Sequence, residues 1–347
     1  MKNNSYSTIY KKMIEIRRSQ EMLISEYHPA DQMRCPIHFC VGQEAAPSAL
    51  SNLLNKIDVI YSHHRSHGYY LAKGGSLTGM ISEFYGKKTG VNGGLAGSQE
   101  LSSAEENFYS GTILSGAFAM SAGSAFASKY TNQNFLTVGI IGDGGMEEGI
   151  IFETINISAK KSLPVLFICE NNNYSIFTSL KERTINKDLH LKVKEFGIET
   201  IKIVNNDVFE INEVFQYSIN KIKNEIKPIF IEIETYRYCP HVGPEENSEY
   251  RSQKELDYWI KNDCIEIAKK NMIKYGYTND FFANIYSETD KMIQKSIEES
   301  KNAEFPNYDD AINCNFQNTY HEIVKNFVKE DESKFELGQK ESKLNPY

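Results

Sequence analysis

The stretch FLTVGIIGDGGMEEG, residues 135–149, decides the fold. Its apolar, partly β-branched beginning predicts a buried strand, and the glycines that follow predict a tight turn into a helix. A turn requires the glycines, but it does not require Asp143, Glu147 and Glu148. We expect Glu147 and Glu148 to begin the helix, where acidic side chains suit the helix dipole. Asp143 therefore indicates a metal or ligand site at the end of this strand.

Strand-like and helix-like segments alternate around this stretch. The pattern predicts strands at 134–142, 163–171, 198–205 and 227–238, and helices at 147–161 and 207–225, the latter opened by Asp207 near its N-cap. Continuous apolar strands that alternate with helices predict an α/β fold with a mostly parallel sheet and helices on both faces. In such a sheet, ligands bind at the carboxyl ends of the strands. Three polar segments fall there: GDGG at 142–145, ENNNYS at 170–175 and YRYCPH at 236–241.

The rest of the chain frames this α/β region. We expect an amphipathic helix over residues 1–20, an ordered loop or lid at 86–107, one helix over 251–276 and another from 281. The sequence contains neither an internal repeat nor a long linker, so we expect a single large domain at 1–320. Residues 321–347 are charged and poor in apolar side chains, which predicts a mobile C-terminal tail.

Composition excludes several classes of function. The chain has 347 residues, is 40% hydrophobic and carries a formal net charge of −8, which argues against a nucleic-acid-binding surface. No apolar run reaches membrane-spanning length, and the N-terminus lacks a signal-peptide core. Six cysteines without C-x-x-C spacing indicate reduced thiols rather than disulfides or a zinc site. We therefore expect a cytoplasmic protein.

Asp143 and Asn172 follow adjacent predicted strands. A carboxylate and an amide oxygen from neighbouring strand ends can converge on Mg²⁺, which accepts a few protein oxygens together with phosphate oxygens. A plain turn would explain the first motif alone, and a polar loop would explain the second alone. The two together, GDG followed by NN one strand–helix unit later, resemble the thiamine diphosphate fingerprint.

Over residues 8–320 the chain resembles a divergent bacterial branch of one family. This family is the alpha subunit of the thiamine diphosphate-dependent decarboxylating component of 2-oxo acid dehydrogenases, as in pyruvate, branched-chain 2-oxo acid and acetoin dehydrogenases. The segments that carry the resemblance, in order, are RCPIHFCVGQEA at 34–45, IYSHHRSHGYYLAKGG at 60–75, 142–179, and TYRYCPHVGP at 235–244 with the helical segment after it. The resemblance implies a thiamine diphosphate-binding fold.

The resemblance also implies roles for individual residues. Asp143, Asn172 and the carbonyl of Tyr174 would bind Mg²⁺. The cofactor would be held by His64, Arg65, Leu114, Gly142, Asp143, Gly144, Gly145, Asn172, Tyr174 and His241, with Arg65 clamping a diphosphate oxygen and the glycines admitting the diphosphate to backbone amides. His38 and His241 would be the catalytic residues at the thiazolium end, where they handle protons and orient the substrate.

The implied activity is decarboxylation of a small, pyruvate-like 2-oxo acid and transfer of the acyl or aldehyde unit to an acceptor such as a lipoyl group. The family's activating glutamate lies on a separate beta subunit, so the chain is expected to be inactive alone and to work as a heterotetramer, with a lipoyl-bearing acyltransferase as a further candidate partner. One alternative is a carboligase that passes the two-carbon unit to a keto-sugar in a surface-sugar pathway. An alternative of another class is a non-catalytic phosphate- or nucleotide-binding module.

Three positions depart from the family pattern near the expected substrate mouth. His64 stands where a tyrosine is usual, Glu100 stands where the loop at 86–107 usually has a histidine, and Val242 stands in place of a serine that mitochondrial relatives phosphorylate. The departures leave the acceptor open. The H-H-x-x-H spacing of His63, His64 and His67 is also weakly compatible with a metal site, and the roles of His63, His67 and Glu100 stay open.

Overall fold

The computed structural model describes residues 2–27, 32–244 and 250–310. The predicted tail at 321–347 lies outside the described residues. Contacts divide the chain into one unit at 1–304 and a second at 305–347. The elements described below all belong to the first unit, in which no described helix is both long and apolar enough to cross a membrane.

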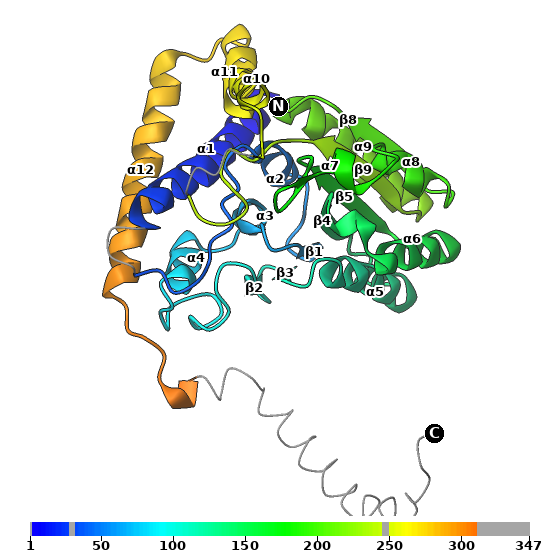
Figure 1. Cartoon of the computed structure of the whole chain (residues 1–347), viewed down its shortest axis with the longest axis horizontal. Coiled ribbons are helices and arrows are strands. Elements are labelled where there is room, and N and C mark those ends of the chain that lie inside the picture. The colour runs from blue at the N-terminus through cyan, green and yellow to red at the C-terminus, as the bar shows by residue number, and fades with distance from the viewer. Residues whose placement is uncertain (1, 28–31, 245–249, 311–347) are drawn as a thin grey trace, which may run out of the picture. The chain divides into compact units, whose positions relative to one another are not determined.

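A seven-stranded sheet forms the centre of this unit, in the order β2-β3-β1-β4-β5-β9-β8. Its strands are β1 (Val59–Ser62), β2 (Ser102–Ser103), β3 (Phe108–Ser110), β4 (Thr137–Gly142), β5 (Val165–Asn171), β8 (Glu199–Ile203) and β9 (Ile229–Glu234). All neighbours pair in parallel except the edge pair β2–β3. A separate hairpin joins β6 (Tyr174–Ser175) to β7 (Thr178–Ser179). The predicted α/β fold with a mostly parallel sheet is confirmed, and the four predicted strands are all present (Figure 1).

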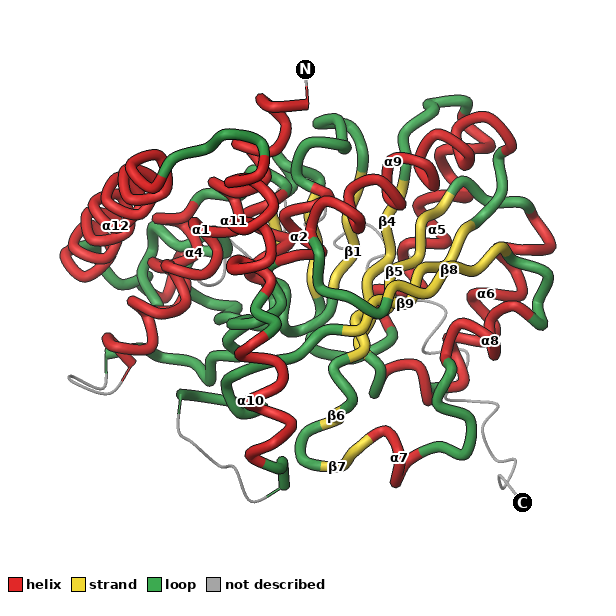
Figure 2. The backbone as a smooth tube through the Cα atoms, turned by 90° about the horizontal axis from the view of Figure 1, so that it is seen from above, coloured by secondary structure: helices red, strands yellow, loops and turns green. Residues whose placement is uncertain are grey.

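Helices cover both faces of the sheet (Figure 2). One face packs against α1 (Lys2–Tyr27), α2 (Ala45–Leu50), α9 (Val208–Glu225) and α11 (Cys264–Lys274), and the other against α5 (Gly116–Thr131), α6 (Gly149–Lys161) and α8 (Leu189–Lys194). Alternate residues of β5 enter the two cores: Leu166 and Ile168 join the first, and Phe167 and Cys169 join the second. Because both sides of β5 are buried, its sequence is continuously apolar.

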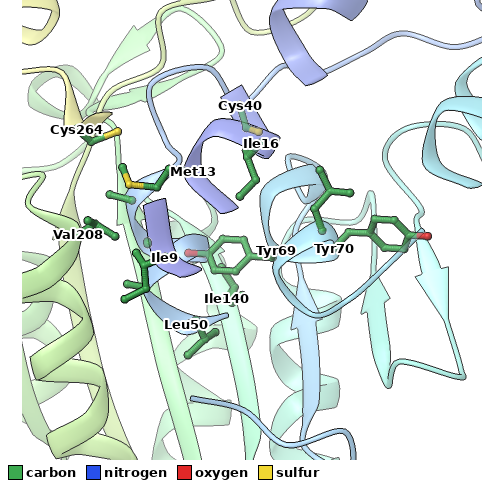
Figure 3. Packing of buried hydrophobic residues seen from close by; sticks show 14 of the residues in the cluster. Ile9, Met13, Ile16, Cys40, Leu50, Tyr69, Tyr70, Ile140, Val208 and Cys264 are labelled. Carbon is green, nitrogen blue, oxygen red and sulfur yellow. The ribbon is translucent and has the colours of Figure 1, made fainter. Parts of the chain in front are cut away.

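The predicted N-terminal helix is longer than expected and belongs to the core. It runs from Lys2 to Tyr27, and Ile9, Met13 and Ile16 are fully buried. Their spacing places them on one helix face, and they belong to the same buried cluster as Ile140 of the sheet (Figure 3). The helix thus closes the hydrophobic core over the sheet face that also carries α9.

The single helix predicted over 251–276 is wrong, because the segment forms α10 (Gln253–Lys261) and then α11. The break comes at Asp263, whose side chain accepts hydrogen bonds from the backbone N–H groups of Ile265 and Glu266 and so caps a new helix. The remaining helices are α3 (His67–Ala72), α4 (Leu77–Phe84), α7 (Leu180–Arg183) and α12 (Asn279–Asn302). The Asp207 N-cap of α9 is confirmed by the bond that its side chain accepts from Phe209 N–H.

The predicted ordered loop at 86–107 is anchored by one buried carboxylate. Glu83, only 1% exposed, accepts four backbone N–H bonds from the loop, at 2.8–3.0 Å. The donors are Asn92, Gly94, Ala96 and Gly97. Four amide donors satisfy a buried carboxylate that would otherwise be costly to desolvate. The loop is therefore held in one conformation, with Gln99 at the site described below.

A buried ion network fastens α1 to two distant parts of the chain. Arg17 donates to both carboxylate oxygens of Glu44, at 2.6 and 2.9 Å, and to Asp263 at 2.7 Å. The Glu44 side chain is fully buried, and Glu44 precedes α2. Burial of such a charge is tolerated only while its partner is in place.

Arg17→Met is expected to lower the free energy of unfolding by about 3–5 kcal/mol, because it leaves the Glu44 carboxylate buried without its counter-ion. Arg18→Met is the matched control: Arg18 is 27% exposed and pairs with Glu21 and Asp290, so its loss should cost about 0–1 kcal/mol. Urea unfolding of the two variants measures the difference. Equal losses would contradict the importance of the buried network.

Candidate active site

The carboxyl ends of β4, β5 and β9 meet at a cavity of about 280 Å³. Every residue that the sequence predicted for the site lines this cavity: His38, His64, Arg65, Leu114, Gly142, Asp143, Gly144, Gly145, Asn172, Tyr174 and His241. The three polar strand ends converge because β4, β5 and β9 are consecutive neighbours in the parallel sheet. Residues far apart in the chain thus share one cavity, and their individual roles stay predictions.

Asp143 is the buried acid of the cavity. It is 1% exposed, and burial raises the pKa of its carboxyl to about 6, although the neighbouring Arg183 guanidinium partly offsets that shift. Arg183 donates to Asp143 through one terminal nitrogen and to Glu147 through the other. At neutral pH the carboxylate is ionised, and Arg183 is its counter-ion.

The expectation that Glu147 begins a helix near a favourable dipole is wrong. Helix α6 begins at Gly149, Glu148 is its N-cap residue without a side-chain cap bond, and Glu147 lies in a short 3₁₀ turn, η1 (Gly145–Glu147). Glu147 instead binds Arg183. The extra acid of the opening motif therefore shares the counter-ion of Asp143.

Asn172 sits at the end of β5, in a turn stabilised by side-chain to backbone bonds. Its side-chain oxygen accepts from Tyr174 N–H at 3.1 Å, and the Asn171 oxygen accepts from Asn173 N–H at 3.0 Å. Asn171 is held in turn by Glu232 of β9, which accepts from its amide at 2.8 Å. This run of Asx turns fixes the Asn172 side chain, 8% exposed, at the cavity wall.

The glycines after β4 are required by close packing rather than by unusual backbone angles. A Cβ atom at Gly144 would lie 2.6 Å from the Ser175 hydroxyl, and one at Gly145 would lie 2.7 Å from the Ile141 side chain. A Cβ at Gly142 would meet nothing within 4 Å. The turn can thus approach the β6–β7 hairpin and the sheet closely, which leaves its backbone at the cavity surface.

Three histidines meet at the other end of the cavity. The His38 ring contacts the rings of His64 and His241 edge-on, each with centroids 4.8 Å apart. Burial, reinforced by nearby Arg65, lowers the pKa of His38 to about 2 and that of His241 to about 4. Their nitrogens lie close enough for a metal. However, two neighbouring guanidiniums, those of Arg65 and Arg237, make this end positive and favour an anion instead.

Arg65 joins the segments that carry two of these histidines. Its guanidinium donates to the Phe39 carbonyl at 2.6 Å and to the His241 carbonyl at 3.0 Å. Burial and the charge of Arg237 lower its pKa to about 9, so it stays cationic at neutral pH. The guanidinium therefore fixes the backbone beside His38 and at His241 while its positive charge lines the cavity.

Sequence reasoning missed Arg237, Arg183 and Glu170, and it left the role of His63 open. Arg237 is 1% exposed, donates to the Ile176 carbonyl, and has a second terminal nitrogen without a partner among the described residues. Arg237 could have been predicted from the sequence, because it lies in the segment YRYCPH at the end of a predicted strand. His63 accepts from Arg65 N–H at 3.0 Å, which leaves its protonated nitrogen 3.4 Å from buried Glu170.

The H-H-x-x-H metal site is not assembled. His67 lies outside the cavity, where its ring nitrogen bonds the Gln20 side chain at 2.9 Å and its ring packs on Phe84. The histidines that do meet are His38, His64 and His241. Glu100 is not among the residues that line the cavity, and its carboxylate accepts bonds from the backbone N–H and the hydroxyl of Thr112.

The cavity has features that suit a metal-bound anion. Asp143 and Asn172 offer oxygen ligands at one end, the chemistry that Mg²⁺ prefers. Arg237 and His38 have buried nitrogen atoms without partners in the described part of the chain. Buried nitrogen atoms without a hydrogen-bond partner destabilise a protein unless a bound ligand provides that partner. The residues present therefore fit an anionic ligand with its cation.

Comparisons with known proteins find similarity over most of the chain. A family model described as dehydrogenase E1 component matches residues 11–309. The pyruvate dehydrogenase E1 component subunit alpha of Rickettsia bellii is 28% identical over 304 residues, 87% of this chain and 93% of that protein. The mitochondrial pyruvate dehydrogenase E1 component subunit alpha of Saccharomyces cerevisiae is 30% identical over 293 residues, 84% and 68% respectively. The matches span all the strand ends described above.

The His38→Gln variant is expected to lose less stability than the wild type as the pH falls. Between about pH 6 and pH 4 the unfolded chain binds a proton at His38, whereas the folded chain, with a pKa of about 2 there, does not. The stability that His38 contributes above its unfolded pKa is therefore lost as pH falls, by up to about 1.4 kcal/mol per pH unit. Urea unfolding at several pH values in this range measures how the free energy of unfolding changes with pH. An unchanged slope in the variant would contradict the lowered pKa of His38.

Proposed function

Because the chain belongs to the dehydrogenase E1 component family, we propose that it decarboxylates pyruvate or a similarly small 2-oxo acid. It is an alpha subunit of the thiamine diphosphate-dependent decarboxylating component of 2-oxo acid dehydrogenases. Relatives named pyruvate dehydrogenase support the choice of substrate. The observation that carries the proposal is the meeting of Asp143, Asn172 and the histidine cluster in one cavity of about 280 Å³.

Asp143, Asn172 and the Tyr174 carbonyl would hold Mg²⁺. Two features support this assignment: the carboxylate and the amide oxygen are both buried at the cavity wall, and Asx turns fix Asn172. Mg²⁺ keeps part of its shell as water or phosphate oxygens, so a few protein ligands suffice. The metal would neutralise the Asp143 charge and draw the diphosphate to this end of the cavity.

The diphosphate would lie along Gly142, Gly144 and Gly145, with His64, Leu114 and Arg65 beside it. Support comes from the close packing of the glycine turn and from the positive charge of Arg65 and Arg237. We add Arg237 to this group because its free nitrogen lacks a partner within the described residues. Bound thiamine diphosphate supplies the carbanion and the electron sink, and the protein supplies position and electrostatics.

His38 and His241 would transfer protons and orient the substrate carboxylate. Both are neutral at neutral pH, because burial and the nearby guanidinium charge lower their pKa values. An anion that neutralises Arg65 and Arg237 removes part of that cause and raises both pKa values towards the range useful for proton transfer. The two imidazoles would thus become effective bases when cofactor and substrate are bound.

A beta subunit would complete the site. Members of this family typically pair with such a subunit, and the proposed assembly is a heterotetramer in which the beta chain contributes the activating glutamate. We also propose a cytoplasmic location, which five free thiols in the described residues support. The acceptor would be a lipoyl group on an acyltransferase.

A carboligase that uses a carbonyl acceptor such as a keto-sugar is the second candidate. The observation that favours it is the altered mouth, where Glu100 is committed to Thr112 and is not free to face an acceptor. His64 at the cavity wall also replaces the usual tyrosine. Neither change involves Asp143 or Asn172, so the proposed metal ligands are the same for both candidates.

Asp143→Ala is expected to abolish the stabilisation by thiamine diphosphate and Mg²⁺ while the fold persists. In the wild-type chain, ligand at about 100 times Kd should add about 2.7 kcal/mol to the stability of the native state. Glu153→Ala, which removes an exposed acid on α6, is the control and should keep the full shift. Thermal unfolding with both ligands, with and without the beta chain, measures it. A full shift in Asp143→Ala would make the metal assignment wrong.

Pyruvate supplied with the beta chain should lead to acyl transfer onto a lipoyl domain. The same mixture with a keto-sugar in place of the lipoyl domain should then give no carbon–carbon bond formation. Mass spectrometry of both acceptors measures the outcome. If the unit is transferred only to the carbonyl compound, the protein is a carboligase and a lipoyl group is not its acceptor.

A further inference from the structure

Arg183 is the one guanidinium in the described residues that binds the acidic turn after β4. Its two terminal nitrogens bind Asp143 and Glu147, and its third nitrogen donates to the Thr178 carbonyl at 3.1 Å. The Arg183 side chain is only 9% exposed. Each of its three nitrogens thus makes a bond, and one of these bonds satisfies the carboxylate expected to hold the metal.

We propose that Arg183 is a resident counter-ion that occupies the metal-binding carboxylate and must leave it when the divalent cation binds. The inference rests on the proposed function, because it takes Asp143 as the Mg²⁺ ligand. Arg183 is accordingly a positioning residue. It holds the Asp143 side chain in place in the metal-free protein, and it sets how much Mg²⁺ is needed to load the site.

Electrostatics makes the two cations compete for Asp143. Arg183 binds one carboxylate oxygen, Oδ2, and the Asp143 side chain is 2% exposed, so a metal on the same carboxylate would lie close to the guanidinium in a poorly screened environment. Like charges repel strongly outside bulk water. Metal binding therefore works against the Arg183 contact, and breaking that contact lowers the net affinity for the metal.

The position of Arg183 links this exchange to the mouth of the cavity. Arg183 ends α7, a single turn closed by a capping box between Ser179 and Glu182. Leu180 N–H donates to the Asn173 carbonyl at 2.7 Å, so α7 is tied to the turn that carries Asn172. Release of Arg183 therefore acts on the same short hairpin that holds the other proposed metal ligands.

The β6–β7 hairpin has a strained backbone, which indicates that neighbouring side chains hold it in its conformation. Ile176, between β6 and β7, has φ of +52°, a backbone region that β-branched residues rarely adopt. Its carbonyl is held by Arg237, and Arg183 holds the other end of the hairpin through Thr178. The two arginines thus fix a strained segment that contributes Ser175 and Ile176 to the cavity wall.

The test is an Mg²⁺ titration of the full chain at saturating thiamine diphosphate and alkaline pH, where Asp143 is ionised. Arg183→Gln should lower the thermal midpoint of the metal-free chain, because Asp143 is left buried without a partner. Mg²⁺ should then raise that midpoint by more than in the wild type, at a half-saturating concentration about tenfold lower, since no charge-assisted bond has to be broken.

Lys181→Gln is the matched control, because it removes the same charge from an exposed position on the same helical turn. It should behave like the wild type. Arg183→Lys keeps the charge without the two-pronged contact and should give a smaller shift in the same direction, which preserves the test if Arg183→Gln does not fold.

The outcomes separate this inference from the proposed function. A wild-type chain that responds to Mg²⁺, together with an Arg183→Gln variant that needs the same or more Mg²⁺, overturns the counter-ion role alone. A wild type and an Arg183→Gln variant that both fail to respond, with the beta chain present, overturn the metal site and this inference together.

Discussion

The buried charge of Asp143 is the constraint on which the rest of the site depends. A carboxylate at 1% exposure is unfavourable unless something positive lies beside it. The described residues meet this need with Arg183, whose guanidinium lies on a short helical turn rather than on the sheet. Under the proposed exchange, this turn would release the carboxylate to the metal without disturbing the sheet.

The cavity wall carries charges of both signs. Asp143 and Glu170 lie at the ends of β4 and β5, and Arg65 and Arg237 line the same cavity. A metal-bound diphosphate carries both signs and can satisfy both sets of charges, whereas a bare anion or a bare cation satisfies only one. Burial is the main reason why the pKa values of the three histidines that meet in this cavity are lowered, and the nearby guanidinium charges lower them further.

Sequence reasoning reached the parts of this site that follow from strand topology. Asp143 and Asn172 could be placed together because they end adjacent parallel strands, and His38 and His241 came from motifs carried by the family resemblance. Arg183 could not be found in this way, because a hairpin and a helical turn return it to Asp143 without any periodic signal. The end of a helix at Asp263 was also missed, since a cap inside a helical pattern becomes visible only when Arg17 and the backbone amides are located.

The departures at the mouth gain a physical meaning once the loop anchor is known. Glu83 fixes the loop through four amides, so a substitution within it changes the side chains presented to the cavity without changing the path of the backbone. Glu100 then bonds Thr112, and this contact closes the loop against the segment that carries Leu114. Because Glu100 is engaged by Thr112, Gln99 of the loop and Thr112 itself line the cavity here instead of a charged side chain. We infer that this loop bears on the choice of acceptor, whereas the proposed metal ligands come from the strand ends.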